Sequence, residues 1–219
     1  DKPILQFIGV NQEKAEENRA IMRELYSILK PLEGNIHFLF ITGITRFSKT
    51  SLFSDMNHLF DITIEKSLAC ICGYTEAELY YNFGERIQYI ANEKNITEDA
   101  LKAEIKLWYN GYKWHQKADS VYNPFSILQF MSSGSGDFQN YWFNSGLPTF
   151  LIHTLNQNGD YDFESVDEDE LALSNFNIDN LDSITLMFQA GYLTIKDRKE
   201  DLYTLVYPNM EVKKALLTT

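Results

Sequence analysis

The segment from His37 to Ser54, HFLFITGITRFSKTSLFS, constrains the fold more than any other part of the sequence. It begins inside an apolar run that extends from Ile36 to Ile41. This run is too short for an ordinary helix and is bounded by turn residues. Such a run favours a fully buried parallel strand. Before it, apolar residues from Lys14 to Lys30 recur on one face of a predicted helix. A helix that leads into a buried strand is typical of an α/β protein.

Polar residues follow this predicted strand at once. Thr42 and Gly43 end it, and Arg46, Ser48 and Lys49 come next. Because ligands of open α/β sheets bind where the strands end, these residues are typical of one wall of an anion site. A core strand followed by an ordinary polar turn explains the same residues, and the residues alone leave both interpretations open. A second short strand is predicted over Asp61 to Ile64.

The size and charge of the chain exclude several classes of protein. With 219 residues it holds one large domain or two small ones. The 31 acidic and 19 basic residues give a net charge of −12, which argues against broad binding to nucleic acid or to anionic membranes. No apolar run approaches the roughly 20 residues of a membrane span. Cys70 and Cys72 are expected to be buried free thiols, so we expect a cytoplasmic protein.

Capping signals predict a helical region in the middle of the chain. Thr75 and Glu78 form a capping box before a helix to about Asn92. Thr97 repeats the cap before a helix to about Tyr109. Asn123 precedes a proline, which suits an N-cap followed by the first helical position.

The composition changes after residue 159. The stretch from Asp160 to Asp182 contains nine acidic residues and no Lys or Arg. A short helix is predicted from Asp182 to Ala190, and strands are predicted over Gly191 to Ile195 and Leu202 to Val206. A final helix opens at Pro208-Asn209. This order suggests a small winged-helix unit.

Familiar catalytic motifs are absent from the sequence. It contains no G-x-x-x-x-G-K-[ST] phosphate loop, no G-x-S-x-G elbow and no HExxH. The four histidines are scattered without ligand spacing, so no metal site is predicted. The aromatic cluster comprises Trp108, Tyr109, Tyr112 and Trp114. It favours a core over a platform for stacking bases.

Six blocks of the sequence, in this order, resemble one family. They read ITGITRFSKTSLFS, DITIEKSLACICGYTEAEL, WYNGYKW, VYNPFSIL, NYWFNSGLPTFL and FQAGYLTI…YPNMEV. They are similar to the AAA-ATPase-like family common in Bacteroides-type bacteria and other anaerobes. Members of this family often carry a PD-(D/E)XK nuclease-like domain at the C-terminus. Asp1-Lys2-Pro3 resembles the end of the family's acidic motif, so its phosphate loop would precede residue 1.

The resemblance implies an α/β to mainly α fold in three parts. Residues 1–68 would be the C-terminal part of a P-loop ATPase core, containing its last strands. Residues 69–159 would form a helical lid, and residues 160–219 a winged-helix-like domain. ATP and Mg²⁺ would bind in the full-length parent, between the missing half and this lid, and neither would be held tightly by this fragment alone.

The resemblance also assigns roles to particular residues. Thr42 occupies the place of a polar sensor that orients the attacking water or touches the γ-phosphate. Arg46 and Lys49 would neutralise phosphate charge or act across a subunit contact. Gly146 and Pro148 resemble a G-x-P motif whose proline packs on the adenine. The fragment alone is not expected to hydrolyse ATP.

Two other functions stay open. One is a protein–protein interaction module with no nucleotide role, whose partner would be another subunit or the nuclease-like domain. The other is weak nucleic-acid binding by the winged helix. Residues from Ser183 to Thr219 include five basic and four acidic side chains, a net charge of only +1. Nucleic acid is therefore not expected as a partner.

Overall fold

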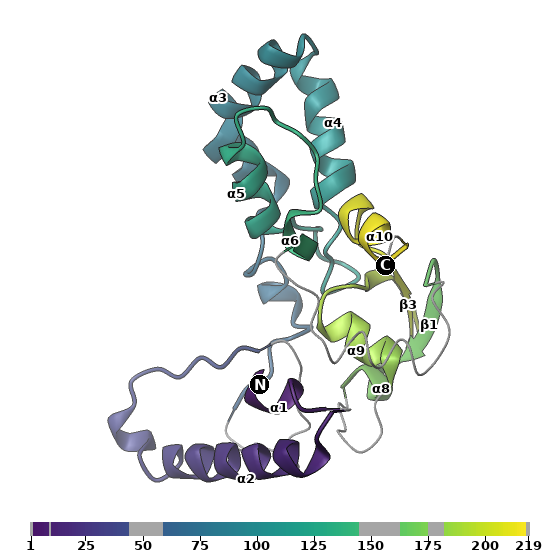
Figure 1. Cartoon of the computed structure of the whole chain (residues 1–219). Coiled ribbons are helices and arrows are strands. Elements are labelled where there is room, and N and C mark those ends of the chain that lie inside the picture. The colour runs from purple at the N-terminus through teal and green to yellow at the C-terminus, as the bar shows by residue number, and fades with distance from the viewer. Residues whose placement is uncertain (1, 9, 44–58, 145–162, 175–181, 218–219) are drawn as a thin grey trace. The chain divides into compact units, whose positions relative to one another are not determined.

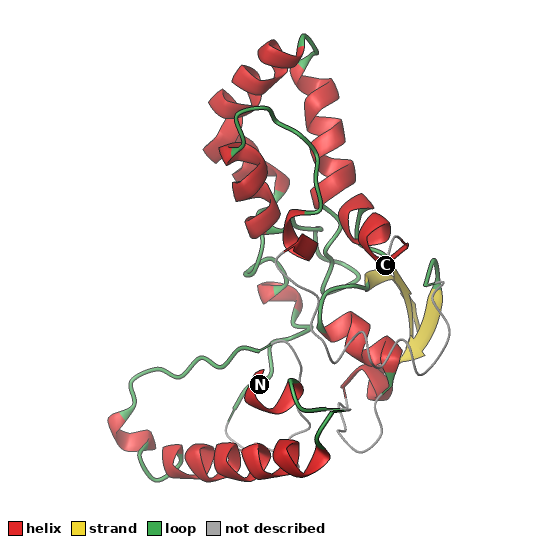
Figure 2. Ribbon diagram, in the orientation of Figure 1, coloured by secondary structure: helices red, strands yellow, loops and turns green. Residues whose placement is uncertain are grey.

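The computed structural model describes residues 2–8, 10–43, 59–144, 163–174 and 182–217 (Figure 1). Helices predominate, and one small sheet is antiparallel (Figure 2). The chain divides into two compact units. Unit 1 consists of Asp1–Phe60, Pro148–Asp160 and Glu168–Ala190, and unit 2 consists of Asp61–Leu147, Tyr161–Asp167 and Gly191–Thr219.

Unit 1 begins with the helices α1 (Lys2–Leu5) and α2 (Gln12–Leu29). The Asn11 side chain caps α2 by accepting a hydrogen bond from the Lys14 N–H at 3.0 Å. Asn18 of α2 donates a side-chain hydrogen bond to the Pro3 carbonyl at 2.6 Å. The helix predicted over Lys14 to Lys30 is therefore confirmed.

The buried parallel strand predicted over Ile36 to Ile41 is not present. After a 3-10 turn, η1 (Glu33–Asn35), residues 36–43 belong to no strand. Phe38 is 79% exposed and Phe40 is 51% exposed. The predicted strand over Asp61 to Ile64 is also wrong, because this segment contains a turn. A parallel strand needs a neighbour to pair with, and no described strand pairs with either segment.

The other described helices of unit 1 are α8 (Glu170–Ser174) and α9 (Ser183–Gln189). Asp182 caps α9 by accepting the Thr185 N–H at 2.6 Å, as its position before the predicted helix implies. The side chains of Thr185 and Gln189 donate hydrogen bonds to carbonyl groups of α8 at 3.1 and 3.2 Å.

Three helices form the main core of unit 2. They are α3 (Glu76–Lys94), α4 (Glu98–Tyr109) and α5 (Pro124–Ser132), and two shorter elements, η2 (Lys66–Leu68) and α6 (Tyr141–Asn144), accompany them. Thr75, Thr97 and Asn123 cap the three long helices, so all three predicted starts are confirmed. The fully buried residues at the centre include Leu79, Ile87, Leu101, Ile105, Tyr109, Ile127 and Phe130.

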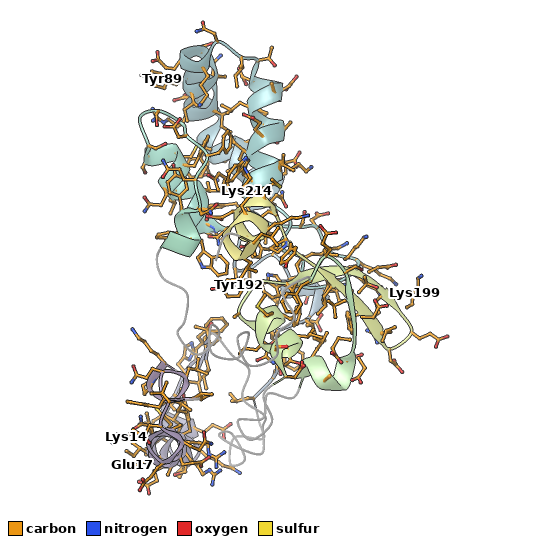
Figure 3. The ribbon with its side chains drawn as sticks, turned by 45° about the vertical axis from the view of Figure 1, so that its right-hand side comes forward. Lys14, Glu17, Tyr89, Tyr192, Lys199 and Lys214 are labelled. Atoms are coloured by element: carbon orange, nitrogen blue, oxygen red, sulfur yellow. The ribbon has the colours of Figure 1, made fainter. Side chains whose placement is uncertain are left out.

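The small sheet has the strand order β1-β3-β2. Its hairpin joins β2 (Thr194–Lys199) to β3 (Leu202–Val206), and β1 (Val166–Asp169) lies on the other side of β3. The hairpin is confirmed, although β2 begins at Thr194 rather than Gly191 and ends at Lys199 rather than Ile195. Glu200 turns the chain with a φ of 54°. Lys199 lies at this end of the hairpin (Figure 3), and α10 (Met210–Leu217) follows.

Two further observations concern cysteines and membranes. Cys70 is half-buried and Cys72 is exposed, and both are free thiols, so the expectation that both are buried is wrong for Cys72. Among the described helices, none combines the length and apolar character that crossing a bilayer requires.

Two glycines of unit 2 provide a matched test of backbone geometry. Gly111 has a φ of +105°, and a Cβ there would collide with the Pro208 carbonyl, whereas a Cβ at Gly84 inside α3 meets nothing within 4 Å. Gly111→Ala should lower the free energy of unfolding by about 2 kcal/mol or more. Gly84→Ala should raise it by about 0.5–1 kcal/mol, because alanine is the better helix former. Urea unfolding followed by circular dichroism measures both, and equal effects would contradict the close approach at Gly111.

Candidate functional site

Of the residues predicted to contact nucleotide, the structure describes Thr42. It is exposed and directly follows the unpaired segment Ile36 to Ile41 in unit 1. Its side chain forms no hydrogen bond with another described residue. Arg46, Lys49, Gly146 and Pro148 lie outside the described residues. The structure therefore does not show whether these five residues meet, and the anion site stays a prediction.

The residues that the structure does bring together come from the last four of the six sequence blocks. They surround a buried carboxyl group in unit 2, and we call them the polar centre. Its members are Asn110, Gly111, Tyr112, Ser126, Trp142, Gly191, Tyr192, Asn209 and Glu211.

Glu211 is the charged member of the polar centre and has no exposed surface. One carboxyl oxygen accepts a hydrogen bond from the Ser126 hydroxyl at 2.7 Å, and the other accepts one from the backbone N–H of Trp142 at 2.8 Å. Ser126 lies in the first turn of α5, where the Asn123 side chain accepts its N–H at 3.2 Å. Glu211 lies in the first turn of α10. One side chain thus connects the starts of α5, α6 and α10.

Asn209 holds the loop after α4 against the start of α10. Its amide group donates to the Asn110 carbonyl at 2.9 Å, and its oxygen accepts the Val212 N–H at 3.1 Å. Gly111 follows Asn110 and allows the backbone of this loop to approach Pro208 closely. The buried hydroxyl of Thr194 then accepts the Lys113 N–H at 2.6 Å. The loop is therefore fixed to both α10 and β2.

Aromatic rings close one side of the polar centre. The Trp142 and Tyr192 ring centroids are 4.8 Å apart, and the Tyr112 ring meets Trp142 edge-on at 6.4 Å. Gly191 has a φ of +82°, and a Cβ there would lie 3.7 Å from the Tyr112 ring and 3.8 Å from the Trp142 ring. Glycine at this position thus provides the turn that leads Tyr192 into this aromatic wall.

Burial dominates the electrostatics of the polar centre. It raises the pKa of Glu211 above its ordinary value, and the hydrogen bonds from Trp142, Ser126 and Tyr141 offset part of this rise. Among the described residues, no Lys, Arg or His forms an ion pair with Glu211. Both of its oxygens already accept hydrogen bonds, so it lacks the free, exposed geometry of a general base. The arrangement is that of a structural tie.

The predicted aromatic core is confirmed for Tyr109 and Tyr112, which are 0% and 6% exposed. Trp108 is half-buried and stacks on Phe138 at 5.6 Å. The Lys214 ammonium of α10 lies 4.4 Å from the centre of the Trp108 ring. Lys214 and Tyr192 are labelled in Figure 3.

The sequence pattern did not mark Glu211 or Ser126, and it marked Asn209 only as the start of the final helix. They lie in two blocks that are otherwise mostly apolar or aromatic: VYNPFSIL also contains Asn123, and YPNMEV contains both Asn209 and Glu211. A polar side chain that is buried needs a hydrogen-bond partner, so such positions could have been paired as a hypothesis. Among the described residues, no group of three or more His, Cys, Asp or Glu is placed to hold a metal ion.

The chain is similar in sequence to a protein family and to a bacterial protein. A family model described as a predicted AAA-ATPase matches residues 1–53, a range that contains Thr42, Arg46 and Lys49. A bacterial protein from Azotobacter chroococcum mcd 1, named as an uncharacterized protein in the vnfD 5′ region, is 36% identical over 222 residues. The match covers 99% of this chain and 40% of that protein, so the chain spans about two fifths of its relative. No solved structure matches the chain.

Substitutions of Glu211 should separate its hydrogen bonds from its charge. Glu211→Ala leaves the Ser126 hydroxyl and the Trp142 N–H without a buried acceptor, and should lower the free energy of unfolding by about 2–4 kcal/mol. Glu211→Gln keeps an acceptor for Trp142 and a partner for Ser126, so its loss at neutral pH should be clearly smaller. Urea unfolding followed by tryptophan fluorescence measures both.

The charge of Glu211 should appear in the pH dependence. Because burial raises its pKa above the ordinary 4.5, the folded state binds this proton more tightly than the unfolded state does. The contribution of Glu211 to stability is therefore greatest below pH 4.5 and falls as the pH rises through the pKa that Glu211 has in the folded state. The stability difference between wild type and Glu211→Gln should shift in favour of the glutamine variant from pH 4.5 to 8. A difference that does not change with pH would contradict this assignment.

Proposed function

We propose that this chain is the C-terminal portion of an AAA-type, signal-transduction-like ATPase. The observation that carries the proposal is the match of residues 1–53 to the predicted AAA-ATPase family. It spans the segment in which a short apolar run is followed by a hydroxyl group and two cations. The length of the curated relative leaves room for a phosphate loop outside the aligned region.

In the proposed protein, Mg-ATP binds between the phosphate-loop half of the core and the helical lid. The exposed hydroxyl of Thr42 is available to a γ-phosphate or to the attacking water. Arg46 and Lys49 follow in the sequence and would neutralise phosphate charge, and Gly146 and Pro148 would contact the base. ATP and Mg²⁺ supply the phosphoryl chemistry when bound.

The C-terminal region would respond to the nucleotide as a winged-helix-like unit. Its hairpin, β2 and β3, is followed by α10, an order consistent with such a unit. The Arg198 side chain of the hairpin is already engaged, because it donates to the Tyr203 hydroxyl at 3.0 Å and to the Glu200 carbonyl at 2.7 Å. This engagement, with the small net charge, disfavours the nucleic-acid alternative. Proposed partners are another subunit or a nuclease-like domain.

ATP turnover tests the proposal. The 219-residue chain alone should show none, whereas a longer protein that includes the phosphate loop should hydrolyse ATP. In that protein Thr42→Ala should lower kcat by about 100-fold, because a group aimed at the reacting phosphate is lost. Thr42→Ser keeps the hydroxyl and should retain most of the activity.

Two results would contradict the proposal. One is turnover by the pure 219-residue chain that Thr42→Ala abolishes. The other is the absence of heat when ATP is titrated into the longer protein with its phosphate loop intact. The second result would favour an interaction module without a nucleotide role.

A further inference from the structure

Both cysteines of the chain lie in one turn of unit 2, shortly before α3. The Gly73 N–H donates a hydrogen bond to the Cys70 carbonyl at 3.3 Å, so Cys70 and Cys72 are the first and third residues of a β-turn. In an extended strand, residues two apart have Cα atoms about 7 Å from each other. A turn shortens this separation into the range of about 4.4–6.8 Å that disulfides span. The backbone therefore places the two thiols within reach of each other.

The two thiols differ in accessibility. Cys72 is exposed, whereas Cys70 is half-buried and donates a weak hydrogen bond to the Asp119 carbonyl at 3.8 Å. Burial raises the pKa of the Cys70 thiol, and the carboxylates of Asp119 and Glu78 add to this rise. Because the thiolate is the form that reacts, Cys72 is the first of the two to meet an oxidant in solution.

We propose that Cys70 and Cys72 form a reversible disulfide, which makes this turn a redox-sensitive switch. The oxidant is a low-molecular-weight disulfide. The Cys72 thiolate attacks one of its sulfur atoms, a mixed disulfide forms, and the first small thiolate leaves. The Cys70 thiolate then attacks the Cys72 sulfur, which closes the bond between the two cysteines and releases the second small thiolate. The protons given up by the two cysteines pass through water to the two released thiolates.

The switch acts on the segment that precedes α5. The hydrogen bond from Cys70 to the Asp119 carbonyl is lost when the Cys70 sulfur turns into the disulfide. The same two segments are joined by the backbones of Tyr74 and Tyr122, which exchange two hydrogen bonds at 3.2 and 2.8 Å. Oxidation therefore loosens residues 119–122 at one end of this contact.

An exposed disulfide of this kind is easily reversed. It closes a loop in which a single residue, Ile71, separates the two cysteines, and Ile71 is itself 59% exposed. Strained or exposed disulfides are reduced more readily than structural ones, and they include the regulatory bonds. The turn can therefore follow the thiol–disulfide balance around the protein. No step uses a nucleotide, so this proposal is independent of the proposed ATPase function.

Mass spectrometry of the 219-residue chain after incubation with oxidised glutathione tests the proposal. Trypsin cleaves after Lys66 and Arg86, so one peptide, residues 67–86, contains both cysteines. In the wild type this peptide should become about 2 Da lighter and carry no glutathione, and reduced glutathione should restore its mass. A wild-type peptide that keeps a glutathione adduct, or one that stays fully reduced, would overturn the proposal.

Two serine variants test the order of attack. Cys70→Ser leaves the exposed thiol of Cys72 without a partner, so a glutathione adduct should accumulate on it. Cys72→Ser leaves the half-buried thiol, which should react with oxidised glutathione at least about 10-fold more slowly. Equal rates in the two variants would contradict the assignment of Cys72 as the attacking thiol. The wild-type measurement needs neither variant to fold.

Amide hydrogen exchange of the wild-type chain tests the consequence of oxidation. Residues 119–122 should exchange at least about 3-fold faster in the oxidised chain than in the reduced chain. Amides of α4 are the internal control and should be unchanged. Equal exchange of residues 119–122 in the two states would show that the disulfide is no switch, even if it forms.

Discussion

The buried carboxyl group of Glu211 is the interaction on which unit 2 depends. It joins Ser126, 85 residues earlier, to the start of α6. A charged group away from water is costly unless donors surround it, and here Ser126 and Trp142 provide them. Because the contact holds α10 beside α5 and α6, it also fixes the surfaces on which the Asn110 loop and the aromatic wall assemble. Only the arrangement that brings α5, α6 and α10 together provides both hydrogen bonds to Glu211, so its burial favours that one arrangement.

The described residues of unit 1 include no buried carboxyl group that ties distant elements together. Its helices have good local signals, such as the Asn11 cap of α2, but Ile21, Leu25 and Ile28 of α2 are all more than half exposed. Most of the stability of a helix comes from burying its apolar face rather than from its own hydrogen bonds. Leu25 and Phe38, which are 54% and 79% exposed, therefore add little packing to the described part of unit 1.

Features that depend on residues close in the sequence could be predicted, whereas contacts between residues far apart in the sequence could not. The caps at Thr75 and Asn123 depend on residues within one turn, so the sequence pattern was sufficient. The tie between Ser126 and Glu211 is set by the tertiary fold and left no local signal. Phe38 shows the opposite error: its apolar run predicts a buried strand, but burial needs neighbours that the described residues do not supply. The short strand β1 escaped prediction because its acidic sequence, VDED, has little strand propensity.

The central claim is that the core of unit 2 is closed, whereas the second half of α2 and residues 36–43 of unit 1 are only loosely packed. Amide hydrogen exchange of the 219-residue chain, resolved along the sequence, tests it most directly. Amides of α3, α4 and α5 should exchange together and at least about 100-fold more slowly than those in the second half of α2. The segment from Ile36 to Gly43 should exchange fastest of these. Protection of α2 equal to that of α3 would contradict the account, because Ile21, Leu25 and Ile28 would then be packed against other residues.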